Sequence, residues 1–195
     1  MLRPNPRGSA GRGASFAEAV IGDMGGLDVQ DILSGIEHLV TTGVADPDRI
    51  GIVGQSYGGF LACWMPVVSD VFKASVSRSP CTDWRSFHLT TNIPEFDDLF
   101  LDGDIWDDGS QYLTRNPLTH HARNTTPTLL TAGRLDLATP ANQAEQMYRA
   151  LEANGVPAAL AIYPEEGHGV QQPPALADQC ARMVAWFERF MPAGR

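Results

Sequence analysis

Short apolar runs alternate along this chain with longer segments in which apolar residues recur at helical spacing. The runs are bounded by turn residues, which predicts buried strands at 50–53, 72–76, 128–132 and 158–163. Helices are expected at 27–40, at 57–68, around 144–151 and at 175–190. Strands that alternate with helices form βαβ units, so the pattern predicts an α/β fold with a mostly parallel sheet flanked by helices.

The ends of two of these elements carry further signals. Residues 5–13 are rich in Gly, Pro, Ser and Arg, and are interpreted as a loop leaving a strand that ends at Met1–Arg3. Thr139 and Pro140 are typical of the cap and first turn of the helix that follows them. With 195 residues, the chain is expected to form a single domain, 1–195.

Residues 83–126 interrupt the alternation of strands and helices. They are polar and acidic, with aromatic residues scattered at Trp84, Phe87, Phe96, Phe100 and Trp106. We expect this segment, about 83–126, to be an insertion over the carboxyl edge of the sheet, where α/β proteins place their sites. Its acidic pairs, 97–98 and 107–108, are interpreted as solvated loop charges.

The strongest chemical signal is the segment Gly54-Gln-Ser-Tyr-Gly-Gly59, which follows a predicted strand and precedes a predicted helix. This context is typical of a nucleophile elbow, in which a sharp turn lifts a serine hydroxyl above the sheet. The turn is expected to require small residues at Gly54 and Gly58. It makes Ser56 the candidate nucleophile, and the Tyr57 amide a candidate oxyanion donor at the start of a helix.

A serine nucleophile needs a histidine to take its proton and a carboxylate to orient that histidine. Asp136 follows the strand ending at Ala132, and His168 follows the strand ending at Tyr163. Both residues therefore leave carboxyl ends of strands, at the same edge as Ser56. Their order in the chain is also the order that serine, acid and histidine take on this kind of sheet.

Other polar residues are weaker candidates. His38 lies on a predicted helix, and His88 is better explained by packing within the insertion. The adjacent pair 120–121 lacks a third metal ligand and is interpreted as a solvated turn. Three acids, Asp23, Asp28 and Asp31, are interpreted as helix-start residues. No cysteine has metal-ligand spacing, so no metal site is predicted.

Composition narrows the class of protein. A formal net charge of −9 argues against a nucleic-acid or anionic-membrane partner, because both need a basic face. No run is long and apolar enough for a membrane span, and the start lacks the apolar region of a signal peptide. Three widely spaced cysteines favour a reducing compartment, so a cytoplasmic location is expected.

Six motifs together resemble the catalytic domain of the prolyl oligopeptidase family of serine peptidases, which includes acylaminoacyl and dipeptidyl peptidases. They are NPRGSAGRG, GDMGGLDVQDI, GQSYGGF, SPCTDW, GRLDLATP and YPEEGHG, and they span nearly the whole chain. The resemblance implies an α/β-hydrolase fold and a peptide substrate, with no metal or cofactor. It implies that Ser56, Asp136 and His168 form a catalytic triad and that the Tyr57 amide is an oxyanion donor. It also implies that the segment containing Trp84 and Phe87 helps to line the substrate pocket.

The sequence departs from that family at its beginning. In the family, the first motif follows the fourth strand of a larger sheet, so the fold is expected to be partial and to lack its first strands. Without them the nucleophile strand becomes an exposed sheet edge, through which the chain is expected to self-associate. Two alternatives stay open: a carboxylesterase or acyl hydrolase on the same fold, and a truncated fragment without catalytic activity.

Overall fold

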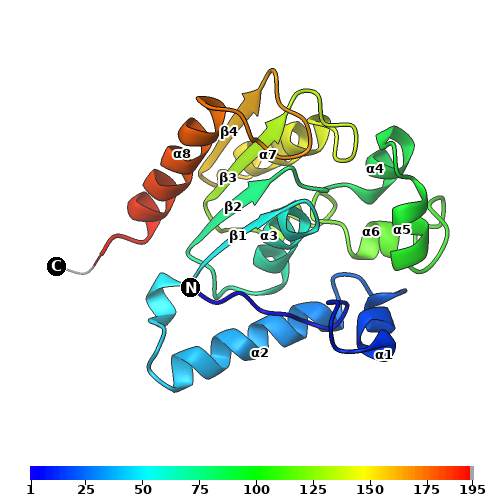
Figure 1. The fold of residues 1–195 in the computed structure, drawn as a ribbon, viewed down its shortest axis with the longest axis horizontal. Helices are drawn as coiled ribbons and strands as arrows, with labels where there is room; N and C mark the ends of the chain where they lie inside the picture. Colours follow the sequence, from blue (N-terminus) through cyan, green and yellow to red (C-terminus); the bar gives the residue numbers. More distant parts are fainter. Residues whose placement is uncertain (194–195) are drawn as a thin grey trace.

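A four-stranded parallel sheet forms the centre of the molecule (Figure 1). The computed structural model describes residues 1–193. The strands are β1 (Gly51–Gln55), β2 (Ala74–Arg78), β3 (Thr128–Gly133) and β4 (Ala158–Tyr163), and they lie side by side in chain order. Every neighbouring pair is parallel, with Val53 opposite Val76 and Val76 opposite Leu129. The predicted α/β class is thus confirmed.

Helices cover both faces of the sheet. The four long ones are α2 (Leu27–Thr41), α3 (Tyr57–Val68), α7 (Asn142–Ala153) and α8 (Ala175–Phe190). On one face, Leu130 and Ala132 of β3 pack against Met147 of α7 and Cys63 of α3. On the other face, Trp186 of α8 covers Val76 and Leu129, which point the opposite way because side chains alternate along a strand.

Helix α3, which follows β1, is buried along most of its length. From Gly59 to Val67 every residue of α3 is buried, since the sheet covers one side and α2 and the insertion cover the other. Phe60, with 0% of its surface exposed, packs against Tyr57, Trp64 and Trp84. A helix that is apolar all round is typical of such a central position.

Short helices make up the rest of the secondary structure, and several of them form the insertion. The N-terminal part carries α1 (Ala14–Ala17) and the 3₁₀ turns η1 (Glu18–Val20) and η2 (Pro47–Arg49). Between β2 and β3 lie α4 (Trp84–Thr90), α5 (Glu95–Phe100), α6 (Gln111–Thr114) and η3 (His121–Arg123). Figure 1 shows α4, α5 and α6, in green, beyond the arrowheads of the central strands, which are their carboxyl ends.

Most predicted elements are confirmed, with ends that shift by one or two residues, and three expectations differ more clearly from the structure. Strand β2 begins two residues late because Phe72 belongs to the buried core before the strand. Residues 1–3 form no strand, because within 1–193 no other strand lies against them to share backbone hydrogen bonds. Helix α7 begins at Asn142, with Ala141 rather than Thr139 at its N-cap, because the Thr139 hydroxyl is used elsewhere.

Strand β1 is an edge of the sheet. Its backbone faces β2 at Ile50, whose carbonyl accepts from Lys73, and at Ser56, whose amide donates to Arg78. Neighbouring residues of a strand direct their backbone groups to opposite sides, so Gly51, Val53 and Gln55 face away from β2. No second strand pairs with β1 within residues 1–193, and the Val53 side chain is 42% exposed. An open edge therefore lies directly beside the serine turn.

None of the helices within residues 1–193 combines the length and the apolar character needed to cross a membrane.

Candidate active site

The turn between β1 and α3 holds Ser56 in an unusual backbone conformation. Its φ of 59° and ψ of −119° lie outside the regions that residues with a side chain normally occupy. Hydrogen bonds fix the turn on both sides, because the Ser56 amide donates to Arg78 at 3.0 Å and its carbonyl accepts from Phe60 at 2.9 Å. A methyl group at Gly54 would lie 2.1 Å from the Gly58 carbonyl oxygen, so only glycine fits there.

The expectation of a second obligatory small residue, at Gly58, is wrong. A Cβ atom built on Gly58 has no other atom within 4 Å, apart from its chain neighbours and its own helix backbone. The crowding in this turn is therefore one-sided. The chain of Gly54 approaches the backbone of Gly58, while the side-chain position of Gly58 points into open space.

The structure brings Ser56, His168 and Asp136 together although they are far apart in the chain. His168 Nε2 lies 2.9 Å from Ser56 Oγ, across a separation of 112 residues. His168 Nδ1 lies 2.9 Å from Asp136 Oδ2, across a separation of 32 residues. Because β1, β3 and β4 are parallel, the loops that follow them meet at one edge of the sheet, and the three side chains form a continuous hydrogen-bonded chain.

Loop contacts hold Asp136 in place. Its Oδ1 accepts hydrogen bonds from the amides of Ala138 and Thr139, each at 2.9 Å. Its Oδ2 lies 3.0 Å from the Thr139 hydroxyl, which also lies 3.0 Å from the Ser79 carbonyl oxygen. The side-chain carboxylate is fully buried. Sequence reasoning missed Thr139 as a site residue, although a threonine three positions after an acid at a strand end fits an Asx-type turn.

A second buried acid shapes the histidine loop. Glu166, 5% exposed, accepts hydrogen bonds from the amides of Gln171 at 2.9 Å and Gln172 at 3.0 Å. Its own carbonyl accepts from the Leu135 amide at 2.9 Å, which joins the histidine loop to the Asp136 loop. Sequence reasoning also missed Glu166, since only the folded loop makes its carboxylate face those amides.

The pKa values of the acid and histidine shift in opposite directions. Burial of Asp136 acts to raise the pKa of its carboxyl, but hydrogen bonds from His168 and Thr139 outweigh it, so that pKa lies below its usual value. The hydrogen bond with Asp136 raises the pKa of His168 above 6.5, against the effect of partial burial. A neutral His168 can take the Ser56 proton at Nε2, and the ionised Asp136 then stabilises the imidazolium that forms.

The predicted pocket residues lie deeper than a substrate contact requires. Trp84 is 1% exposed and Phe87 is 2% exposed, and both belong to the core cluster around Phe60. The Trp84 indole donates to the Arg115 carbonyl and so supports the insertion. These side chains have almost no surface with which to contact a substrate in this structure, and their assignment to the pocket stays a prediction.

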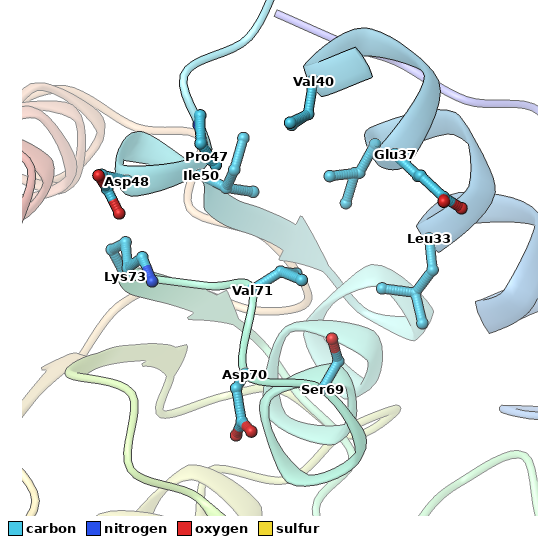
Figure 2. A pocket seen from close by; sticks show the side chains of 11 residues that line it. Leu33, Glu37, Val40, Pro47, Asp48, Ile50, Ser69, Asp70, Val71 and Lys73 are labelled. Atoms are coloured by element: carbon cyan, nitrogen blue, oxygen red, sulfur yellow. The ribbon is translucent and has the colours of Figure 1, made fainter.

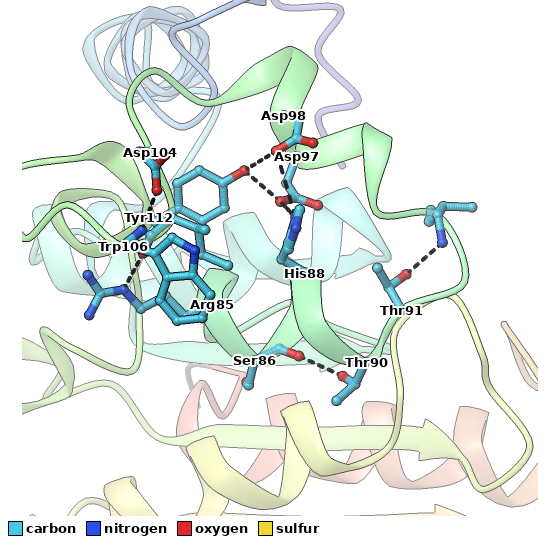
Figure 3. Close-up of polar contacts among 12 residues, drawn as sticks. Arg85, Ser86, His88, Thr90, Thr91, Asp97, Asp98, Asp104, Trp106 and Tyr112 are labelled. Atoms are coloured by element: carbon cyan, nitrogen blue, oxygen red, sulfur yellow. Dashed lines mark hydrogen bonds and ion pairs between the residues drawn. The ribbon is translucent and has the colours of Figure 1, made fainter.

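The insertion contains a polar cluster around Tyr112 (Figure 3). The Tyr112 hydroxyl lies 2.7 Å from Asp97 Oδ2 and 2.9 Å from Asp98 Oδ1, and His88 Nδ1 lies 2.7 Å from Asp97 Oδ2. The interpretation of Asp97 as a solvated charge is wrong, because its side chain is fully buried between these partners. One possible metal-ligand atom from each of His88, Asp97 and Asp98 lies within 4.8 Å of the other two. These side chains already hydrogen-bond to one another and to Tyr112, so the group is explained as a hydrogen-bonded cluster.

A groove of about 580 Å³ lies at the opposite end of the sheet (Figure 2). Leu33, Glu37 and Val40 of α2 line one side, and Ile50 and Val71 line the other. Because Ile50 precedes β1 and Ser56 follows it, this groove opens away from the serine turn. It therefore has no part in the candidate site.

Similarity to known proteins agrees with this geometry. A family model described as "Prolyl oligopeptidase family" matches residues 1–193. The chain is 33% identical to the "Uncharacterized peptidase YuxL" of Bacillus subtilis (strain 168), over 96% of this chain and 29% of that protein. It is 29% identical to the acylamino-acid-releasing enzyme of Arabidopsis thaliana, over 95% of this chain and 26% of that enzyme.

Solved structures are similar over the same region. The acylaminoacyl peptidase of Pyrococcus horikoshii superimposes with a TM-score of 0.92 and 31% identity, over 98% of this chain and 32% of that one. A puromycin-hydrolyzing peptidase of Mycobacterium tuberculosis gives a TM-score of 0.92 and 28% identity, over 96% of this chain and 29% of that one.

The fold is therefore that of the α/β-hydrolase peptidases, with the serine on the turn after a sheet strand. Within that class, the chain belongs to the prolyl oligopeptidase family. It spans about a third or less of the length of the relatives it matches.

Replacing Gly54 and Gly58 by alanine, one at a time, tests which of the two positions in the turn is too crowded for a side chain. Gly54→Ala is expected to destabilise the fold by several degrees in thermal unfolding, because the new methyl group must displace the Gly58 backbone. Gly58→Ala is the matched control, and its melting temperature is expected to stay within about 2 °C of the unmodified chain. Equal losses in both variants would contradict the one-sided crowding.

The ionisation of His168 can be followed by NMR. We expect its pKa to lie above 6.5, and to fall in Asp136→Asn because that substitution removes the negative charge facing Nδ1. Asp178→Asn is the control, since Asp178 pairs with Arg182 and not with a histidine. An Asp136→Asn variant with an unchanged His168 pKa would show that the two side chains are not coupled.

Proposed function

We propose that this chain carries the catalytic machinery of a serine peptidase that hydrolyses peptide bonds of short peptides through an acyl-enzyme. The observation that carries the proposal is the hydrogen-bonded chain from Ser56 through His168 to Asp136, with both distances at 2.9 Å. Membership of the prolyl oligopeptidase family supports a peptide substrate.

In the proposed reaction, His168 takes the proton of Ser56 as the serine oxygen attacks the carbonyl carbon of the peptide bond. The tetrahedral oxyanion accepts a hydrogen bond from the Tyr57 amide, one of the first amides of α3 and thus without an acceptor inside the helix. His168 then gives the proton to the leaving amine, which leaves an acyl group on Ser56. Water attacks that ester with His168 again as the base, and Ser56 is regenerated.

The names of the relatives support acylated or short peptides as substrates of the whole enzyme. They include acylamino-acid-releasing enzymes, and an acylaminoacyl peptidase structure in complex with a Z-Gly-Gly-Phe-chloromethyl ketone. No metal or cofactor takes part in the proposed steps. The three free cysteines, two of them buried, support the proposal of a cytoplasmic location.

An esterase or acyl hydrolase would use the same three side chains, so it stays the second candidate. The ratio of kcat/KM for an amide and an ester with the same acyl group separates the two activities. A catalytically silent fragment is the third candidate, and only a direct test of the serine's reactivity distinguishes it from the first two.

Covalent labelling with a fluorophosphonate probe tests the proposed nucleophile. We expect labelling at Ser56, identified by mass spectrometry of the modified peptide, because only an activated serine reacts readily. Ser56→Ala is expected to abolish labelling, and to lower any hydrolysis by about 10⁴-fold or more. Ser34→Ala, on the exposed face of α2, is expected to label like the unmodified chain. Failure of the unmodified chain to label would favour the silent fragment.

We further propose that the chain self-associates through the open edge of β1. The backbone groups of Gly51, Val53 and Gln55 face away from β2, and such an edge is a template for pairing with another strand. The occupant we propose is β1 of a second copy of this chain.

A charge on this edge should weaken that association. Val53→Lys is expected to shift the chain toward monomer in analytical ultracentrifugation, because a lysine on an edge strand disfavours pairing. Val44→Lys, at a valine that is 73% exposed after α2, is the control and is expected to leave association unchanged. A chain that is already monomeric at high concentration would contradict the proposal.

A further inference from the structure

The side chain of the residue after the nucleophile is tied to a different helix. The Tyr57 hydroxyl donates a hydrogen bond to Asp28 Oδ2 and lies 3.3 Å from the Gly25 amide, which donates to it. The Tyr57 ring stacks on Phe60 with their centroids 5.6 Å apart. The first residue of α3 is therefore fixed at its backbone by the turn and at its hydroxyl by the start of α2.

Asp28 lies in the first turn of α2, as its position in the sequence predicts, but its side chain is buried. It is 1% exposed, and its Oδ1 finds no hydrogen-bond partner within residues 1–193. Burial raises the pKa of its carboxyl, and the hydrogen bond from Tyr57 opposes that effect. A buried carboxylate costs free energy unless its hydrogen bonds offset the loss of water. Its main partner side chain is the one next to Ser56.

The hydrogen bond between Tyr57 and Asp28 lies next to the turn that carries Ser56, where a small displacement would change the direction of the Tyr57 amide. Ser56 holds a strained conformation, and the Tyr57 amide that follows it is the proposed oxyanion donor. A rotation of the first turn of α3 would re-aim this amide without breaking the hydrogen bonds among Ser56, His168 and Asp136. Restraining the Tyr57 ring at its far end resists such a rotation, because the ring is rigid between its backbone and its hydroxyl.

We propose that Asp28 is a positioning residue for the reaction: through the Tyr57 hydroxyl it fixes the direction of the Tyr57 amide toward the oxyanion. This inference rests on the proposed function of Ser56 and adds a residue from another helix to it. Asp28 touches no reacting atom. Its effect on the reaction passes entirely through the Tyr57 side chain.

Two substitutions at the two ends of the hydrogen bond test the idea. Tyr57→Phe removes the donor and keeps the ring. Asp28→Asn keeps an acceptor oxygen of the same shape, so it is expected to fold even if Tyr57→Phe does not. Complete loss of an oxyanion donor costs 10² to 10³ in rate, and a misaimed donor is expected to cost about tenfold in Tyr57→Phe and less in Asp28→Asn. The rate measured is fluorophosphonate labelling of Ser56.

The control is a Tyr→Phe change at another tyrosine–aspartate pair. Tyr163, at the end of β4, donates to Asp178 at 3.0 Å. Tyr163→Phe is expected to lower the melting temperature without slowing the labelling. For an ester substrate, Tyr57→Phe is expected to lower kcat and to leave KM within about twofold, since the oxyanion forms only after the substrate binds. A general loss of structure would instead slow the labelling in Tyr163→Phe as well, and would change both kcat and KM in Tyr57→Phe.

The double variant Tyr57→Phe/Asp28→Asn is expected to label no more slowly than Tyr57→Phe, because Tyr57→Phe already removes the hydrogen bond that Asp28→Asn weakens. Tyr57→Phe that labels at the rate of the unmodified chain would overturn the inference, while the proposed function would stand. Additive losses in the double variant would also overturn it.

Hydrogen exchange decides the inference if the unmodified chain does not label, which would count against the proposed function. The Phe60 amide donates to the Ser56 carbonyl and reports on the turn directly. We expect it to exchange faster in Asp28→Asn than in the unmodified chain or in Tyr163→Phe. Equal protection in all three would overturn the positioning role.

Discussion

The backbone turn at Ser56 is the constraint on which the rest of this structure depends. A residue with a side chain at φ 59° costs about 1–3 kcal/mol, so the surroundings must hold it. On one side of the turn, β1 is fixed by its pairing with β2. On the other side, the buried helix α3 is fixed by its packing between the sheet and α2. The burial of α3 and the position of α2 are therefore linked to the geometry of a single serine.

The other two side chains reach the serine because of a general property of parallel sheets. The loops after β1, β3 and β4 all leave the same edge of the sheet. His168 therefore lies beside Ser56, which is 112 positions away in the chain, and beside Asp136, which is 32 positions away. Buried carboxylates then hold the loops after β3 and β4. Asp136 accepts hydrogen bonds from the amides that follow it, and Glu166 accepts them from amides after the histidine. The precision of the site comes from these loop contacts as much as from the sheet.

The sheet, its helices and the positions of Ser56, Asp136 and His168 could be predicted because each depends on local pattern and strand direction. The supporting residues could not. Thr139 was interpreted as a helix cap, although its hydroxyl instead lies between Asp136 and Ser79. Asp28 has the same local sequence whether it faces water or a buried tyrosine, so only the packing of α2 on α3 reveals its role. Burial depends on how the whole chain packs, so the residues next to Asp28 in the sequence do not reveal it.

The order of the strands also bears on how the molecule is made. Because β1, β2, β3 and β4 are adjacent in space in the order of their synthesis, each new strand meets a finished neighbour as it emerges from the ribosome. The sheet can grow in one direction, and no strand has to be inserted between two others. Within residues 1–193, the edge of β1 beside the serine turn gains no neighbouring strand at any stage of this growth, so its backbone groups must be satisfied from outside these four strands.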